Sequence, residues 1–480
     1  MSASYETVIG LEIHTKLNSS TKLYCGCQNS QEFDDMPANT HICPVCTWQP
    51  GALPVVQEEA LEKAVQLGLA LWCSVPEYSF FDRKSYFYPD LPMGYQITQY
   101  TKPTCVDGLV TYPNHDFSNF SEARIRDAHI ENDTGKTIQE GDKVILDYNR
   151  AGTPLVEIVT EPDFRTDDDV IAFLKELQRT IRYEGIGDAD MEKGQMRCDV
   201  NVSIRPMGTT TYGTRVELKN MNSFSAIKRA IQHEVERQIG VVEGWWQVEQ
   251  ETRWWDDARS VSYVMRSKAN ALDYRYFPEP DLPPLHLTAE WIAARKAELQ
   301  ELPVEKIKRY RDVYGFNKEY INVLIGDIQT NQRFEQFVKD GFEPALIAKW
   351  FAGPLAKYLN QHMKSISDLV CTYETMKGFF SAIQSGSLSD AHAKQVFEHL
   401  LAESGSVEDI VAHYGFTTMT DEELGRLAQE VFADNPQAVA DLKAWKMQSA
   451  WFLVGQIVRA SGWKADAKKV KELIEKMFAS

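Results

Sequence analysis

Phe277-Pro-Glu-Pro-Asp-Leu-Pro-Pro-Leu285 is the stretch that divides this chain of 480 residues into two parts. Four of its nine residues are proline, which fits neither the interior of a helix nor a central strand, because it lacks a backbone N–H. Glycine, proline and alternating polar and apolar positions are frequent before this stretch, whereas helical periodicity prevails after it. The sequence therefore predicts the α+β class for residues 1–285 and an all-α structure for the rest.

The length of the chain predicts several domains, because a single hydrophobic core seldom exceeds about 250–300 residues. A softer boundary falls at Glu403-Ser-Gly-Ser406, where small and polar residues interrupt the helical pattern. We therefore expect a first domain over residues 1–285, a helical domain over 286–403 and a C-terminal helical tail domain over 404–480.

Two amphipathic helices are expected in the first domain, over about residues 57–72 and 167–183, where apolar residues recur every three or four positions. In the second part of the chain, Pro354 interrupts a helical pattern. Since proline removes a backbone donor and its ring clashes with the preceding turn, this position predicts a kinked helix.

The formal net charge of −18 disfavours broad, nonspecific binding of nucleic acid. The charge is unevenly distributed, because the stretch from Lys443 to Lys476 contains eight Lys or Arg and only three Asp or Glu. A nucleic-acid partner is therefore expected to meet a local basic face, and the tail domain offers one.

No apolar run approaches the roughly 20 residues that a membrane-spanning helix needs. The first residues, Met1-Ser-Ala-Ser-Tyr5, resemble neither a secretory signal nor an Arg-rich transit peptide. These observations predict a cytoplasmic protein without a membrane partner. Disulfides are rare in that compartment, so the eight cysteines are expected to be reduced.

Four of the cysteines form two pairs, Cys25-Gly-Cys27 and Cys43-Pro-Val-Cys46. Paired cysteines on short loops at such spacings are typical of a zinc site with four thiolate ligands. A closed shell of four thiolates leaves no position for water, so we expect a structural zinc ion in an insert over about residues 25–46. The alternative is that the four are unrelated core cysteines, as we expect for the other four of the chain.

Residues Val8 to Leu17 alternate between apolar and polar side chains, which predicts a half-buried strand. Glu12 and His14 are two residues apart, so they lie on the same face of this strand. A carboxylate and an imidazole that point the same way can bind a divalent metal. The alternative for this pair alone is a buried histidine beside a surface glutamate.

A second stretch with the same alternation, His129-Ile-Glu131-Asn-Asp133, places a histidine and two carboxylates on one face. If this strand lies beside the strand of Glu12 and His14, the two supply several oxygen ligands, which suits Mg²⁺ better than zinc. We therefore hypothesise a magnesium site between two neighbouring strands. The alternative is a solvated polar strand.

Two further alternating runs, Asp199 to Arg205 and Thr214 to Asn220, are joined by turn residues at Pro206-Met-Gly208. They predict an antiparallel ribbon with one mixed-charge face. Such a face can hold a phosphorylated ligand and its metal, or it can carry only surface ion pairs. The polar residues of this face are Asp199, Asn201, Ser203, Arg205, Arg215, Glu217 and Lys219.

The stretch Phe80 to Gln96 is dense in aromatic and charged residues, and Lys84 lies within it. Long irregular segments in compact domains are often functional. The alternative is a surface loop with aromatic anchors. Because the chain lacks the Lys-Ser/Thr of a phosphate-binding P-loop, we expect any bound ATP to lie on a sheet.

Eight collinear motifs, taken together, resemble the GatB family, the B subunits of the aspartyl/glutamyl-tRNA amidotransferases in the GatCAB complex. The resemblance covers essentially the whole chain. The motifs are Val8-Ile-Gly-Leu-Glu12-Ile-His14, Cys43-Pro-Val-Cys46 with Pro50–Pro54, Phe81–Asp90, Asp147–Asp163, Arg197–Ser203, Gly213–Asn220, Asp273-Tyr-Arg-Tyr-Phe-Pro-Glu-Pro-Asp281 and Phe452-Leu-Val-Gly-Gln456.

This resemblance implies an ATP- and Mg²⁺-dependent enzyme that phosphorylates the side-chain carboxylate of Glu-tRNA(Gln) or Asp-tRNA(Asn). Ammonia that the amidase subunit of the complex releases from glutamine then displaces the phosphate, and a small third subunit joins the other two. A mischarging aminoacyl-tRNA synthetase is a further implied partner. The implied fold is a cradle-like antiparallel sheet related to glutamine synthetases, followed by helical and tail domains, with the tail binding tRNA.

The resemblance also implies roles for individual residues. Magnesium ligands are implied at Glu12, His14 and Glu131, and Lys84 resembles a residue at the exit of the ammonia channel. The nucleotide contacts expected on the ribbon are Asp199, Ser203, Arg205, Arg215, Glu217 and Lys219. One position departs from the family, since Asn132 stands where a carboxylate is frequent, and either Asn132 or Glu131 must then serve as the ligand.

The composition and the zinc signal alone would also suit a protein of another class, a noncatalytic zinc-stabilised tRNA-binding module. The two hypotheses differ in ATP chemistry, since only the enzyme releases ADP. The sequence leaves open whether Glu-tRNA(Gln), Asp-tRNA(Asn) or both are substrates.

Overall fold

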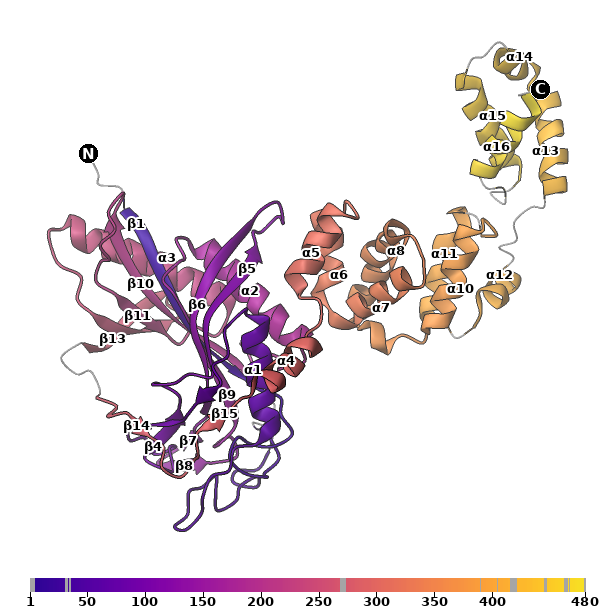
Figure 1. The fold of residues 1–480 in the computed structure, drawn as a ribbon. Coiled ribbons are helices and arrows are strands. Elements are labelled where there is room, and N and C mark those ends of the chain that lie inside the picture. Colours follow the sequence, from indigo (N-terminus) through magenta and orange to yellow (C-terminus); the bar gives the residue numbers. More distant parts are fainter. Residues whose placement is uncertain are drawn as a thin grey trace. The chain divides into compact units, whose positions relative to one another are not determined.

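The computed structural model divides into two compact units, Met1–Lys308 and Arg309–Ser480 (Figure 1). It describes residues 5–478 except 31–32, 34–35, 268–272, 389, 404, 415–420, 444–446, 462–464 and 466. The fold is mixed α+β, as the sequence predicts, with strands in the first unit and helices throughout the second. The three-domain division proposed from the sequence stays a prediction.

A sheet of eight strands organises the first unit, in the order β13-β12-β11-β10-β1-β9-β6-β5. Neighbouring strands are antiparallel except β11 and β12. The strands are β1 (Tyr5–Lys16), β5 (Cys105–Pro113), β6 (Phe120–Asn132), β9 (Pro154–Thr160), β10 (Met196–Pro206), β11 (Val216–Lys219), β12 (Glu251–Asp256) and β13 (Val261–Ser267).

The expectation of a wholly antiparallel sheet is wrong at the pair of β11 and β12, which is parallel. The reason is the connection between them, which runs through helix α3 (Phe224–Glu243). A helix between two strands returns the chain to the same edge, so the second strand runs in the direction of the first. The predicted ribbon of β10 and β11 is antiparallel and confirmed, with Asn201 paired to Glu217.

Alternation along β1 places apolar residues on one face of the sheet, where Leu11 and Ile13 are buried. Helices α1 (Glu58–Ala70), α2 (Asp167–Tyr183) and α3 cover this face, and their apolar side chains join one continuous core with it. The predicted helices are confirmed, and the hydroxyl of Thr166 caps α2 by accepting from the backbone of Asp169. The opposite face of the sheet remains free to hold polar groups.

Short strands complete the first unit. β3 (Asp82–Ser85), β4 (Tyr95–Thr98) and β14 (Phe277–Pro278) form a small sheet of three strands. β2 (Tyr78–Ser79) pairs with β15 (Leu285–His286), and β7 (Lys136–Glu140) forms a hairpin with β8 (Lys143–Asp147). The proline-rich stretch thus begins and ends in strands of this unit, and α4 (Ala289–Glu298) then packs beside α1, where Arg295 pairs with Glu62.

The second unit contains α6 to α16, which follow α5 (Pro303–Asp312) at the boundary between the units. The predicted kink at Pro354 is a π-helical segment, Phe351–Leu355, between α8 and α9, and such a bulge accommodates a missing backbone donor. The helices are α6 (Lys318–Gly326), α7 (Ile328–Lys339), α8 (Pro344–Trp350), α9 (Ala356–His362), α10 (Tyr373–Gln384), α11 (Asp390–Ala402), α12 (Val407–Tyr414), α13 (Asp421–Asp434), α14 (Pro436–Lys443), α15 (Met447–Ala460) and α16 (Ala467–Phe478).

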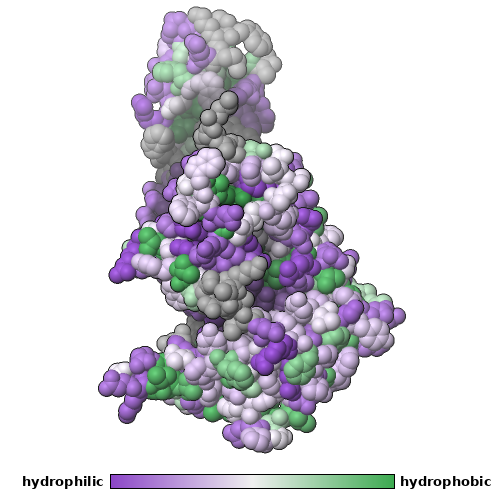
Figure 2. Space-filling model, turned by 90° about the vertical axis from the view of Figure 1, so that its left-hand side faces the viewer, coloured by the Kyte–Doolittle hydropathy of each residue, from purple (hydrophilic) through white to green (hydrophobic). Residues whose placement is uncertain are grey.

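The last helices share a small core of their own, in which Leu424, Leu453 and Val470 are buried. Part of the basic stretch Lys443 to Lys476 falls in this region, and part of it lies outside the described residues. Among the residues that the structure describes, no helix is long and apolar enough to cross a membrane. Hydrophobic and hydrophilic side chains are interspersed on the face shown in Figure 2.

Candidate active site

A polar cavity of about 1030 Å³ opens in the first unit. Side chains from β1, β6, β9, β10 and β11 line it, together with the segments that carry Lys84, Tyr100 and Tyr276. The cavity therefore lies over the face of the sheet opposite α1, α2 and α3. The position follows from the alternation of the strands, which sends polar residues to this face and apolar residues into the core.

A row of titratable side chains crosses three neighbouring strands at the cavity. Backbone pairing sets His14 of β1 opposite Glu157 of β9, and Glu157 opposite His129 of β6. One carboxylate oxygen of Glu157 lies 3.3 Å from Nε2 of His14 and 3.3 Å from Nε2 of His129. Glu131 approaches His14 at 3.2 Å, and Glu12 lies two residues before His14 on the same face.

These side chains form two overlapping groups that could each hold a metal ion, Glu12 with His14 and Glu157, and His129 with Glu131 and Glu157. In each group, one potential ligand atom per residue lies within 4.8 Å of the others. Carboxylate oxygens outnumber imidazole nitrogens in the combined cluster, which suits a hard cation such as Mg²⁺. We call these five residues the Glu–His cluster.

One buried atom of the cluster lacks a partner. Within the part of the chain that the structure describes, Oε2 of Glu131 is buried and has no hydrogen-bond partner. A carboxylate oxygen without a partner in the interior costs free energy unless a cation or a donor meets it. The residues present therefore fit a bound divalent cation.

The pKa values of Glu12 and His14 also reflect the carboxylates that lie close together in the cluster. Burial, and then the nearby charge of Glu157, raise the pKa of Glu12 to about 7. Burial alone would lower the pKa of His14, but the carboxylates of Glu157 and Glu131 raise it well above its usual value. A divalent cation among these groups would favour the ionised carboxylates and the neutral imidazoles.

Glu157 itself stays ionised despite its burial, because His129 and His14 hold its pKa well below the usual range. His129 is held in turn by Asp127, whose oxygen lies 2.7 Å from its Nδ1. Burial would lower the pKa of His129, but Glu157 and the bond to Asp127 raise it to about 10. Asp127 therefore orients the ring, as an outer carboxylate does for a metal-binding histidine.

Two lysines bring positive charge to the cavity. Lys84 of β3 lies 5.1 Å from the ring of Tyr274, and the carboxylates of Glu131 and Glu157 outweigh its burial and raise its pKa. Lys219 of β11 is held by ion pairs to Asp199 and, at 3.0 Å, to Glu217. Both ammonium groups therefore stay charged at neutral pH beside the Glu–His cluster.

The structure brings most of the predicted site residues together, but not all of them. The residues Glu12, His14, Lys84, Glu131, Asp199, Glu217 and Lys219 line the cavity. Ser203, Arg205 and Arg215 do not. Arg205 lies six residues along β10 from Asp199, roughly 20 Å at the rise of a strand, and it pairs with Glu6 instead.

Asn132 does not join the cluster. Its side-chain carbonyl oxygen accepts a hydrogen bond of 2.9 Å from the backbone of Ile97 in β4, and the side chain is buried. The alternation of β6 sends it to the face opposite Glu131. Of the two residues that the sequence leaves open as ligands, Glu131 is therefore the one that faces the cluster.

One expectation about the strands is wrong. β1 and β6 are not neighbours, because β9 lies between them and pairs with both. Glu157, which this strand contributes, is not among the site residues that the sequence predicts. A signal was present, since Glu157 is the one charged residue in Pro154–Thr160, an otherwise uncharged and nearly wholly buried strand.

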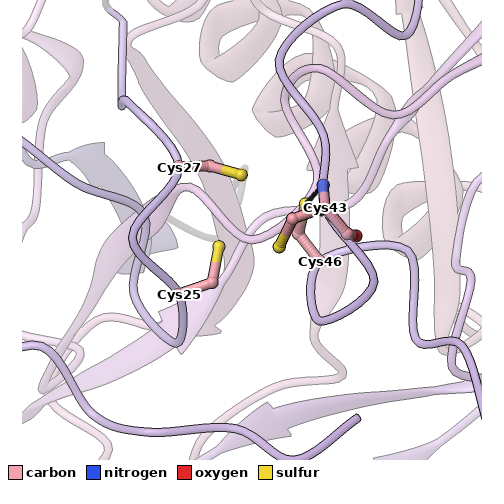
Figure 3. Close-up of side chains that lie close together, drawn as sticks. All are labelled: Cys25, Cys27, Cys43 and Cys46. Atoms are coloured by element: carbon pink, nitrogen blue, oxygen red, sulfur yellow. Dashed lines mark hydrogen bonds between the residues drawn. The ribbon is translucent and has the colours of Figure 1, made fainter.

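The four cysteines of the two pairs meet on two loops of the first unit (Figure 3). Cys25 and Cys27 come from one loop, Cys43 and Cys46 from the other, and the four sulfur atoms all lie within 4.8 Å of one another. Thiolates around a tetrahedral zinc ion are roughly 3.8 Å apart, given Zn–S bonds of about 2.3 Å. The quartet therefore fits a single metal ion with a closed thiolate shell.

One sulfur of the quartet, that of Cys46, lies where negative charge is stabilised, whereas burial raises the pKa of Cys27 to about 11. A hydrogen bond from Cys25, and then the charge of Lys22, lower the pKa of Cys46 to about 5. Lys22 is fully buried, and its Nζ lies 3.6 Å from Sγ of Cys46 and 2.9 Å from the carbonyl oxygen of His41. The other four cysteines are buried and separate from the quartet, as expected of core residues.

Comparison with known protein families agrees with this arrangement. The family model described as the GatB/GatE catalytic domain matches residues 7–293, and the one described as the GatB domain matches residues 332–478. The cavity, the Glu–His cluster and the cysteine quartet all lie within the first of these stretches. The match over residues 7–293 thus gives the class of protein, that of the GatB/GatE catalytic domain.

Curated relatives extend the match to the full chain. One is the B subunit of the aspartyl/glutamyl-tRNA(Asn/Gln) amidotransferase of Crocosphaera subtropica, 41% identical over 486 residues, covering 99% of this chain and 98% of that one. The relative of the same name from Symbiobacterium thermophilum is 42% identical, with 98% and 97% covered. The one from Carboxydothermus hydrogenoformans is 40% identical, with 99% of both covered. The chain belongs to the GatB family, the B subunits of these tRNA-dependent amidotransferases.

Proposed function

We propose that this chain phosphorylates the side-chain carboxylate of Glu-tRNA(Gln), Asp-tRNA(Asn) or both with ATP, and then amidates it with ammonia. The observation that supports this most is the Glu–His cluster at one cavity with two ammonium groups. A carboxylate is a poor acyl donor, so it must first become an acyl phosphate. The charge of the transferring phosphoryl group requires cations at fixed positions.

The residues proposed to hold Mg²⁺ are Glu12, His14 and Glu131, and Glu157 joins them on geometry. A bound Mg²⁺ would neutralise charge on the phosphates of ATP during transfer. The protein's own contribution is to orient these ligands on three rigid strands. Asp127 fixes the ring of His129, so that the imidazole faces Glu157 rather than solvent.

Lys219, with Asp199 and Glu217, is proposed to meet the nucleotide at the edge of the cavity. Ser203, Arg205 and Arg215 stay predictions for this role, and their places outside the cavity lining weaken it. Two cations that do line the cavity are Arg126 and Arg197, with side chains 60% and 50% exposed. These two guanidinium groups are better placed to bind phosphate oxygens.

Lys84 is proposed to lie where ammonia enters from the amidase subunit, since ammonia must arrive unprotonated and away from bulk water. The small third subunit of the complex is the proposed link between the amidase and this chain, and a mischarging synthetase is a further partner.

We also propose that the large sheet is the glutamine-synthetase-like cradle and that the quartet holds a structural zinc ion. The tail domain is proposed to bind tRNA. The reaction is proposed to take place in the cytoplasm.

The experiment that tests the proposal is an assay of ADP release by the assembled complex. ATP, Mg²⁺ and mischarged Glu-tRNA should together give ADP, and omission of the tRNA should reduce its release to background. Uncharged tRNA is the control, because it offers the same surface without the reacting carboxylate. Tight binding of Glu-tRNA with no release of ADP would favour a noncatalytic tRNA-binding module instead.

A further inference from the structure

Five tyrosines form a continuous row at the cavity, which we call the tyrosine row. Their ring centroids follow one another from Tyr88 to Tyr86 at 5.9 Å, to Tyr274 at 6.0 Å, to Tyr276 at 5.9 Å and to Tyr100 at 4.2 Å. The rings come from three separate segments, after β3, after β4 and before β14. The fold therefore assembles the row from distant parts of the sequence.

The row lies beside the proposed reaction centre. All its members except Tyr88 line the cavity. Nζ of Lys84 lies 5.1 Å from the ring centroid of Tyr274, and the hydroxyl of Tyr86 bonds to Gln96 at 3.1 Å. Two inner rings of the row, Tyr86 and Tyr274, are thus in contact with other residues of the cavity lining.

The two ends of the row face solvent. Tyr100 is 66% exposed and Tyr88 is 59% exposed. The ring of Tyr100 stacks on Tyr276 with 9° between their planes, so its other face is the exposed one. A planar aromatic face that is exposed in the lining of a polar cavity suits a flat ligand better than it suits packing of the protein's own core.

We propose that the tyrosine row is a stacking platform for the unpaired bases at the 3′ end of the aminoacyl-tRNA, with Tyr100 as the outermost ring. This inference rests on the proposed function. The reacting carboxylate belongs to an amino acid esterified to the 3′-terminal ribose, so the last nucleotides must approach the cavity with it. Stacking on aromatic rings holds single-stranded bases without reading their sequence, so the same row serves Glu-tRNA and Asp-tRNA.

The adenine of ATP has the same flat π face, so the shared chemistry is a nucleobase and its source must be tested. The assembled complex is assayed with Glu-tRNA, ATP and ammonium chloride, which bypasses glutamine hydrolysis. Tyr100→Ala should raise KM for Glu-tRNA about tenfold, with kcat and KM for ATP nearly unchanged. Tyr100→Phe keeps the aromatic plane and should restore the KM of the unmodified enzyme.

Tyr78 provides a matched control. It is 61% exposed and stacks on His286 at 4.6 Å, but it lies outside the cavity lining. Tyr78→Ala should leave KM for Glu-tRNA unchanged. An equal rise in both alanine variants, or a rise in KM for ATP rather than for Glu-tRNA, would overturn the proposal.

A binding measurement tests the platform without turnover. A Glu-tRNA that carries 2-aminopurine at its 3′-terminal position should lose fluorescence when the base stacks on the unmodified enzyme and on Tyr100→Phe. The loss should be absent with Tyr100→Ala. Equal quenching by all three would overturn the platform even if the complex releases ADP, whereas quenching without ADP release would leave the platform standing and count against the proposed function.

Discussion

Glu157 lies between two histidines in the lining of the cavity, and its carboxylate is shared by both groups that could hold a metal. His14 and His129 lower the pKa of Glu157, and Glu157 in turn raises the pKa of both histidines. Glu157 also raises the pKa of Glu12, but there it disfavours the charged form, because two carboxylates repel. The residue thus organises the charge of the whole cluster.

Glu12→Gln should make the folded protein more stable but abolish its amidation activity. Without a bound cation, the pKa of Glu12 is raised from 4.5 to about 7. Between these values the folded protein holds a proton that the unfolded chain has lost, so the free energy of unfolding falls as pH rises through this window. The neutral amide removes that cost, and we expect the variant to be about 1–3 kcal/mol more stable than the wild type at pH 8 in EDTA.

The same variant should lose amidation of Glu-tRNA, while glutamine hydrolysis by the amidase subunit is partly retained. Denaturant unfolding in EDTA at pH 5 and pH 8 measures the first effect, and added Mg²⁺ should reduce the difference between variant and wild type. A variant that is no more stable than the wild type at pH 8, or that forms Gln-tRNA normally, would contradict the assigned role of Glu12.

The candidate site could be predicted from the sequence only in part. Glu12, His14 and Glu131 follow from alternation on two strands, because a period of two is visible locally. The position of Glu157 beside these residues could not be predicted, because the pairing of β9 with β1 and β6 depends on contacts between distant segments of the chain. Arg205 shares the polar face of Asp199, but shared alternation says nothing of distance along a strand, and it lies outside the cavity.

At the scale of elements, the strand β9 determines the geometry of the site. It lies between β1 and β6 and is paired to both, which brings His14, Glu157 and His129 into one row. Helices α1 and α2 and the ribbon of β10 and β11 could be predicted because their periodicity and turn residues are local signals. The strand order could not, because the residues between β1 and β9 carry no pattern that specifies it.

The cysteine quartet joins two loops that no helix or strand of the described residues connects, so we expect metal to stabilise the first unit. Cys27→Ser should reduce bound zinc from about one ion per chain to none and lower the melting temperature of this unit by about 5–10 °C. Zinc content and thermal unfolding measure this. Cys371→Ser is the control, because Cys371 is a buried cysteine outside the quartet, and it should retain zinc. A zinc-free protein of unchanged stability would refute the structural role.

At the scale of the whole molecule, the chain carries a negative net charge, and so does the tRNA on which a tRNA-dependent amidotransferase acts. The net charge of −18 makes attraction depend on local basic regions, and the sequence from Lys443 to Lys476, with eight Lys or Arg and three Asp or Glu, is one such region. The helices that carry it share their own core around Leu453, so this region is built as a separate cluster of helices. The mainly helical character of residues 309–480 could be predicted because helical periodicity is local, but how the two units sit together could not.

Removal of residues 406–480 should weaken binding of tRNA and flatten its dependence on salt. Each phosphate contact that is lost removes a released counterion, and the slope of log K against log salt falls by about 0.7–0.9 per contact. Titration of labelled tRNA between about 50 and 200 mM salt measures the slope. An unchanged slope would contradict the placement of the tRNA contacts in the tail.

If the Glu–His cluster holds the cation for phosphoryl transfer, the rate of ADP release should depend on it as Mg²⁺ is titrated. Glu157→Gln should reduce the rate at least about 100-fold at any Mg²⁺ concentration, because it removes the shared carboxylate. Glu184→Gln is the matched control, since Glu184 is buried outside the cavity and burial raises its pKa. We expect loss of ADP release in Glu157→Gln and its retention in Glu184→Gln. Release of ADP by Glu157→Gln at the wild-type rate, with unchanged Mg²⁺ dependence, would contradict this role of the Glu–His cluster.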